Sequence, residues 1–168
     1  GGRGLARAGS AGTCGGCRPR AEVSCPALGT LGEHTEGTAC PRLQVPERMV
    51  SAKPAGLSWE EAAAFPLTFL TAWRMLTTRA RLQRGETLLV VGAGAGVSVA
   101  AILIGRHLGA RVLATSRSEE KLEQARKLGA EQAFPTEGLS GPARELTGKL
   151  GVDVIFDSVG AATIDEDL

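Results

Sequence analysis

Hydrophobic positions in the second half of the chain alternate between two spacings. Short unbroken apolar runs are typical of buried strands, and the stretches between them carry apolar residues every three or four positions, as helices do. Strands are therefore predicted at 87–91, 111–115, 131–134 and 152–156, and helices at 97–108, at 118–129 and from about Pro142 to 148–151.

Strands and helices that alternate through short loops predict an α/β fold, a Rossmann-type doubly wound parallel sheet with helices on both faces. Right-handed crossovers give the four predicted strands the order 3-2-1-4. A complete dinucleotide-binding sheet has about two more strands. We therefore expect the chain to be a fragment that contains a partial Rossmann domain.

A helix start signal precedes the predicted sheet. Ser58 and Glu61 have the spacing of a capping box, in which each side chain bonds the backbone amide of the other residue. The helix that begins there is predicted to end at Phe65, because Pro66 starts a new segment. A second helix is predicted over 67–82.

Composition and charge exclude several classes of protein. The formal net charge is +1 and tyrosine is absent, so a nucleic-acid partner has no support. The longest apolar stretches, 88–91 and 97–104, are too short to span a bilayer. No signal-peptide pattern opens the chain, so we expect a cytoplasmic protein with no membrane partner.

The turn between the first strand and its helix is rich in glycine. Residues 92–97 read G-A-G-A-G-V, with Val97 at the third glycine position of the G-x-G-x-x-G pattern. Gly92 suits a tight turn, and Gly94 and Gly96 leave no side chain between the backbone and a diphosphate. Its place between a strand and a helix favours a nucleotide-binding turn. The alternative is a turn whose glycines only let the helix pack close to the strand.

Residues after the second strand select the nucleotide. An acidic residue about 20 positions after the glycines would bind a ribose diol, but Thr115, Ser116 and Arg117 stand there, with Lys121 one turn later. Hydroxyls and a guanidinium suit a 2′-phosphate, which favours NADP(H) over NAD(H). The alternative is that Arg117 lies in a solvated turn and that Ser118 only caps the next helix.

Three cysteines near the start of the chain are candidate zinc ligands. Cys14, Cys17 and Cys25 could each supply a thiolate, but tetrahedral structural zinc needs four ligands. Arg20 occupies the place of a further evenly spaced cysteine, and Cys40 is far away in the sequence. The alternative is that these cysteines bind no metal.

Blocks of sequence over about residues 30–168 resemble the medium-chain dehydrogenase/reductase superfamily, in particular its zinc-type alcohol dehydrogenase and quinone oxidoreductase branch. They lie at 32–37, 45–48, 53–54, 57–73, 85–101, 109–130 and 151–160. The resemblance implies that residues 1–50 are the irregular remnant of a GroES-like catalytic domain and that residues 51–168 form the partial Rossmann domain. It also implies a homo-oligomeric parent enzyme.

The resemblance implies site residues by position. Those on the pyrophosphate turn are Gly92, Ala93, Gly94, Ala95, Gly96 and Val97, and those near the adenosine ribose or its phosphate are Thr115, Ser116, Arg117 and Lys121. Thr71 lies on the nicotinamide side, and Val159 lies on a cofactor-lining loop after the fourth strand. Cys14, Cys17 and Cys25 would be a degenerate structural-zinc lobe. Leu67 stands where zinc-dependent members have a catalytic cysteine, so catalytic zinc has no support and the catalytic residues are unknown.

We therefore expect an oxidoreductase that binds NADP(H) or NAD(H) and transfers hydride to or from an alcohol, aldehyde, enone or quinone. One alternative is a nucleotide-binding module without catalysis. Another is an S-adenosylmethionine-dependent methyltransferase. The methyltransferase family usually has acidic residues before the glycines and at the end of the second strand, where this chain has Val91 and Ser116.

Overall fold

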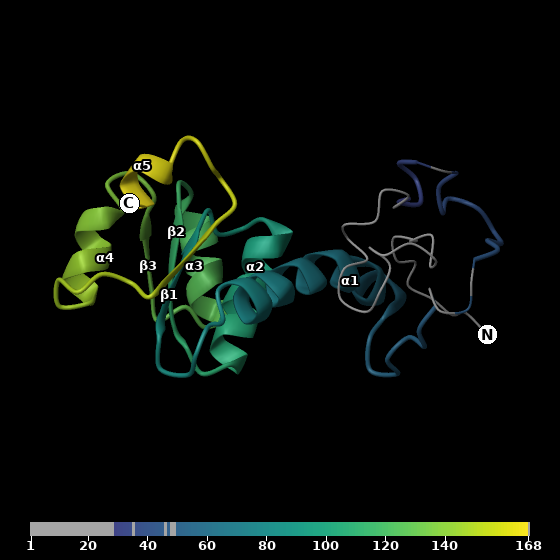
Figure 1. The fold of residues 1–168 in the computed structure, drawn as a ribbon, viewed down its shortest axis with the longest axis horizontal. Coiled ribbons are helices and arrows are strands. Elements are labelled where there is room, and N and C mark those ends of the chain that lie inside the picture. The colour runs from purple at the N-terminus through teal and green to yellow at the C-terminus, as the bar shows by residue number, and fades with distance from the viewer. Residues whose placement is uncertain (1–28, 35, 46, 48–49, 168) are drawn as a thin grey trace, which may run out of the picture. The chain divides into compact units, whose positions relative to one another are not determined.

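The structure, a computed structural model, describes residues 29–34, 36–45, 47 and 50–167 (Figure 1). The chain divides into two units between Ala64 and Phe65. The domain boundary at residue 50 that the sequence suggests stays a prediction. The second unit contains the sheet.

A parallel four-stranded sheet forms the centre of the second unit. Its strands are β1 (Thr87–Val91), β2 (Arg111–Ser116), β3 (Gln132–Pro135) and β4 (Val154–Asp157). Their order is β3-β2-β1-β4, so the predicted order is confirmed. Leu89 is paired with Leu113 of β2 and with Ile155 of β4, which places β1 at the centre.

Helices cover both faces of the sheet, as predicted (Figure 1). They are α2 (Gly96–His107), α3 (Glu119–Leu128), α4 (Ser140–Leu146) and the short α5 (Ile164–Asp167). Helices α2 and α3 lie on one face and α4 lies on the other (Figure 1). None of the described helices combines the length and the apolar content that crossing a bilayer requires.

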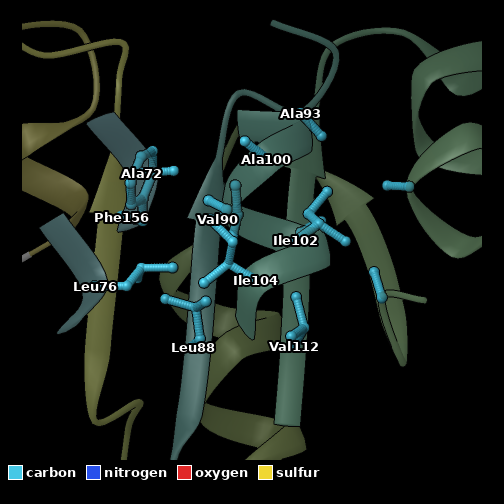
Figure 2. Close-up of a cluster of buried hydrophobic side chains, with 14 of the residues drawn as sticks. Ala72, Leu76, Leu88, Val90, Ala93, Ala100, Ile102, Ile104, Val112 and Phe156 are labelled. Atoms are coloured by element: carbon cyan, nitrogen blue, oxygen red, sulfur yellow. The ribbon is translucent and has the colours of Figure 1, made fainter. Parts of the chain in front are cut away.

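Successive residues of β1 point to opposite faces and enter two separate cores. Leu88 and Val90 pack with residues of α2 and α3 on one face (Figure 2). Leu89 and Val91 pack on the other face with residues from β3 and α4. All five residues of β1 are buried, which explains why the strand is an unbroken apolar run in the sequence.

The segment before the sheet differs from its prediction. Helix α1 runs from Trp59 to Trp73 through Pro66 and continues as a π-helical turn, η4 (Arg74–Arg79). The predicted break at Pro66 is therefore wrong, although proline removes a helical hydrogen bond. Ala72 and Leu76 anchor the later part of this segment, because both are buried in the larger core (Figure 2).

The predicted capping box at the start of α1 is present. The Glu61 amide donates to Ser58 Oγ at 3.1 Å, and the Ser58 amide donates to Glu61 Oε2 at 2.8 Å. These bonds satisfy two backbone groups at a helix end that would otherwise lack a partner. They stabilise the first turn of a helix that contains proline.

Gly105 in α2 allows the helix to approach the sheet closely. A β-carbon there would lie 2.6 Å from Cδ2 of Leu88 and 3.1 Å from Cγ2 of Val112, both of them buried. We expect Gly105→Ala to lower the free energy of unfolding by about 1–3 kcal/mol through overpacking. Urea denaturation measures this change.

Gly141 in α4 is a matched control, because no atom beyond its chain neighbours and the backbone of its own helix lies within 4 Å of the position of its absent β-carbon. Gly141→Ala is expected to be neutral or to stabilise the fold by up to about 1 kcal/mol, since alanine restricts the unfolded chain. Equal stabilisation by both substitutions would contradict the close approach of α2 to the sheet.

An ion pair joins the starts of β2 and β3. Arg111 Nη2 lies 2.7 Å from Glu131 Oε1, and Arg111 Nη1 donates to the Leu146 carbonyl at 2.7 Å. The hydrogen bond between the two side chains lowers the pKa of Glu131 and raises the pKa of Arg111. The ionised pair therefore favours the folded state.

Glu131→Gln is expected to lower the free energy of unfolding at pH 7 by at most about 1 kcal/mol, because the pair is partly exposed. The pKa of Glu131 is lower in the folded than in the unfolded chain. Its stabilisation is therefore present above the unfolded-state pKa and is lost as the pH falls through the folded-state pKa. Denaturation at several pH values tests this, with Glu137→Gln on an exposed glutamate as control. An unchanged difference from wild type at all pH values would contradict the assignment.

Candidate functional site

The glycine turn joins β1 to α2 at the carboxyl edge of the sheet. Gly92 has φ +77° and Gly94 has φ +108°. Residues that carry a β-carbon rarely adopt such positive φ angles. Ala95 is extended, with φ −84° and ψ 152°, and α2 begins at the next residue. The backbone conformation thus requires glycine at two positions of the turn.

Three elements contact the turn, one at each glycine. A β-carbon would lie 2.7 Å from Val159 Cγ2 at Gly92, 2.5 Å from Lys121 Cδ at Gly94, and 2.9 Å from Thr68 Cγ2 at Gly96. Lys121 belongs to α3, Thr68 belongs to α1, and Val159 follows β4. The absence of side chains therefore lets three parts of the chain converge on the backbone that leads into α2.

Thr115 connects the turn to the ends of β2 and β3. Its side chain is fully buried, and its Oγ1 accepts hydrogen bonds from the Gly92 amide at 3.4 Å and from Thr136 Oγ1 at 3.1 Å. The Thr115 carbonyl accepts from the Ala93 amide at 2.6 Å. The structure therefore places Thr115 beneath the turn, where it holds the backbone, rather than on the surface.

Two basic residues lie at the carboxyl edge of the sheet, one just after β2 and one in the first turn of α3. Arg117 and Lys121 are exposed, and within the described part of the chain neither makes an ion pair. Ser116 is buried, and its Oγ accepts a hydrogen bond from the Ser118 amide at 3.3 Å. Arg117 and Lys121 are therefore the members of this group that can reach a ligand, whereas Ser116 shapes the loop that carries Arg117.

The start of α2 supplies hydrogen-bond donors to the same edge. Ala95 makes no side-chain cap, and the first amides of the helix, from Gly96 to Ser98, have no partner within the helix. Such amides and the positive end of the helix dipole attract anions. Together with Arg117 and Lys121, they can hold a ligand that carries several phosphates.

The loop after β4 is ordered by Asp157. Its Oδ1 accepts from the Val159 amide at 2.6 Å, and its Oδ2 accepts from Thr163 Oγ1 at 2.7 Å. These bonds hold Val159, which is 49% exposed, between Gly92 and solvent. The predicted cofactor-lining residue thus lies directly beside the turn.

Helix α1 contributes a residue that the sequence reasoning missed. Thr71 is exposed, and its hydroxyl donates to the Leu67 carbonyl at 2.7 Å, within its own helix. Thr68, one turn earlier, is the residue that contacts Gly96. Residues three apart on a helix share a face, so the predicted role of Thr71 could have drawn attention to Thr68.

The candidate zinc ligands Cys14, Cys17 and Cys25 lie outside the described residues. Among the residues that are described, no group of histidine, cysteine, aspartate and glutamate side chains could hold a metal ion. Cys40 is exposed, and its thiol donates to the Arg42 carbonyl at 3.2 Å. The zinc prediction stays untested.

Comparisons with known proteins identify similar chains. Residues 96–168 match the family model of zinc-binding dehydrogenases. A 2-haloacrylate reductase from Burkholderia sp is 33% identical over 150 residues, which are 88% of this chain and 44% of the reductase.

Solved structures show the same similarity. A structure of an NAD-dependent alcohol dehydrogenase matches with a TM-score of 0.91 and 42% identity, over 95% of this chain and 47% of that one. The quinone oxidoreductase of Thermus thermophilus, solved also with NADPH, matches with a TM-score of 0.66 and 36% identity, over 73% of this chain and 40% of that one. The chain spans less than half the length of each of these three relatives.

The bonds at Thr115 generate a prediction for the turn. Thr115→Val keeps the shape of the side chain but leaves the partly buried Gly92 amide without its acceptor, so the free energy of unfolding should fall by about 1–3 kcal/mol. Thr136→Val removes only one of the two donors and should have a smaller effect. Thermal or urea denaturation of both variants measures the difference. A neutral Thr115→Val would show that its hydroxyl does not hold the turn.

Proposed function

Because the chain belongs to the medium-chain dehydrogenase/reductase superfamily, we propose that it forms the nicotinamide-dinucleotide-binding part of an oxidoreductase and that it favours NADP(H) over NAD(H). The observation that carries the proposal is that the uncapped start of α2, the glycine turn, the Lys121 side chain on that turn and Arg117, which follows β2, all lie at the carboxyl edge of the sheet. Open α/β sheets bind ligands at this edge, where the order of the strands reverses.

The donors at this edge fit a dinucleotide diphosphate. The positive φ angles of Gly92 and Gly94 expose the turn backbone, and the start of α2 presents amides toward the same place. In the proposed complex these amides bind the diphosphate, and Lys121, whose methylene groups lie over Gly94, brings its ammonium group beside it. Val159 and Thr68 border the turn and limit how far the dinucleotide can shift across it.

Arg117 supports the preference for a phosphorylated cofactor. It lies just after β2, and neither that position nor the end of the strand carries a carboxylate that would bind a ribose diol. A guanidinium can hold a 2′-phosphate with two hydrogen bonds. The similar structures include an NAD-dependent enzyme and an enzyme solved with NADPH, so the preference rests on this chain's own residues.

The bound nicotinamide would supply the redox step by carrying a hydride. The residues of this chain would bind and orient the dinucleotide. The substrate of the whole protein would be an alcohol, aldehyde, enone or quinone. Val91 and Ser116 leave the ends of β1 and β2 without the carboxylates that an S-adenosylmethionine-dependent methyltransferase would use, which disfavours that alternative.

Arg117→Gln tests the cofactor assignment. Loss of a charged hydrogen bond to the 2′-phosphate should weaken NADPH binding by about tenfold or more and leave NADH binding within about twofold. Calorimetric titration of the wild type and the variant with each nucleotide measures both constants.

Arg144→Gln provides the control, since Arg144 is an exposed arginine on α4. It should change neither affinity. Wild-type protein that binds NADH more than about tenfold tighter than NADPH would contradict the role of Arg117. A wild type that binds S-adenosylmethionine but neither nucleotide would overturn the proposed function itself.

A further inference from the structure

The first turn of α3 places two carboxylates beside the cations of the nucleotide edge, Arg117 and Lys121. Glu119 and Glu120 lie between these two residues in the chain. Consecutive Cα atoms are about 3.8 Å apart, so the Cα atoms of Arg117 and Glu119 are separated by at most about 7.6 Å. A carboxylate at that separation can pair with Arg117, and it repels a phosphate that Arg117 binds.

Both carboxylates are bonded instead to residues further along α3. Arg126 Nη1 lies 3.2 Å from Glu119 Oε1, about two helical turns from the start of the helix. Gln124 Nε2 donates a hydrogen bond to Glu120 Oε1 at 3.4 Å. Among the ion pairs of the described residues, none joins either glutamate to a cation of the nucleotide edge.

Arg126 is itself held in place by the sheet. Its Nη2 donates to the Ala133 carbonyl of β3 at 2.7 Å, and its Nη1 lies 3.4 Å from Glu123 Oε2. The Arg126 side chain is 39% exposed, whereas that of Glu119 is 78% exposed. The guanidinium is therefore the fixed member of the pair, and it determines where the more exposed Glu119 carboxylate lies.

The alternative is that this ion pair only stabilises α3. Exposed ion pairs contribute little to stability. Carboxylates in the first turn of a helix are also favoured by the helix dipole without any partner. The helix itself therefore gains little from the contact between Arg126 and Glu119, whereas a carboxylate two residues from Arg117 affects the charge that a phosphate meets there.

We propose that Arg126 is a positioning residue for cofactor selection. It holds the Glu119 carboxylate beside β3, so that Arg117 pairs with the 2′-phosphate of NADP(H) rather than with Glu119. This role rests on the proposed function. NADH has no 2′-phosphate, so the contact between Arg126 and Glu119 should have little effect on its binding.

The test compares the two members of the ion pair in the full chain by calorimetric titration. Arg126→Gln should weaken NADPH binding by about two- to fivefold and leave NADH binding within about 1.5-fold. Glu119→Gln should leave NADPH binding unchanged or tighter, because it removes the carboxylate itself. The double variant should bind NADPH as Glu119→Gln does, since Arg126 acts through Glu119.

Lys127→Gln is the matched control. It removes one positive charge at the next position of α3, where Lys127 Nζ lies 3.9 Å from Glu123 Oε1. This substitution leaves the contact between Arg126 and Glu119 in place, so neither nucleotide affinity should change.

Nuclear magnetic resonance supplies a readout that needs no nucleotide. The Nε–H resonance of Arg117 should shift in Arg126→Gln, because the released Glu119 carboxylate can then pair with Arg117. It should return to its wild-type position when Glu119→Gln is added. A resonance that shifts in Arg126→Gln and does not return would overturn the role of Glu119.

The outcomes separate this inference from the proposed function. Equal weakening of NADPH binding by Arg126→Gln and by Glu119→Gln would overturn the positioning role, since a purely structural ion pair loses the same contact in both variants. Equal weakening of NADPH and NADH by Arg126→Gln would overturn it as well. A wild type that binds NADPH, with an affinity that Arg126→Gln leaves unchanged, would overturn the positioning role alone. A wild type that binds neither nucleotide would overturn the proposed function and with it the role of Arg126 in selection.

Discussion

The carboxyl edge of this sheet depends on the close approach of other segments to the backbone between β1 and α2. Side chains are absent at Gly92, Gly94 and Gly96, and each gap is filled from a different part of the chain. Helix α1, helix α3 and the loop after β4 could not meet there around a turn with β-carbons. The positive φ angles of the first two glycines impose a second, independent requirement for glycine.

The fold could be predicted largely from the hydrophobic pattern, because a parallel strand covered on both faces must be apolar at every position. Strand β1 illustrates this, since Leu88 and Leu89 enter different cores and both are buried. Right-handed crossovers then predict the strand order 3-2-1-4, which is the order in the structure. The capping box at Ser58 could also be predicted, because its two partners are three positions apart in the sequence.

The errors and omissions concern interactions between distant segments. The sequence predicts a break at Pro66, but tertiary packing of Ala72 and Leu76 holds the later helix in place, and α1 continues through the proline. The site could be predicted in outline, since the glycine turn and Arg117 lie where the strand pattern places them. The sequence could not predict that the buried Thr115 side chain bonds to the turn, or that Thr68 contacts Gly96. Each of these interactions depends on a partner far away in the sequence, which no local spacing identifies.

The two interpretations of the glycine turn, nucleotide binding and close packing, do not exclude each other. Contacts with Val159, Lys121 and Thr68 would require small residues at these positions even in a protein that bound nothing. The glycines by themselves therefore discriminate poorly between the two. Packing alone gives no reason for two exposed cations beside an uncapped helix start, since exposed surface charges contribute little to stability. The argument for a phosphate ligand thus rests on Arg117, Lys121 and the amides of α2 more than on the glycines that first suggest it.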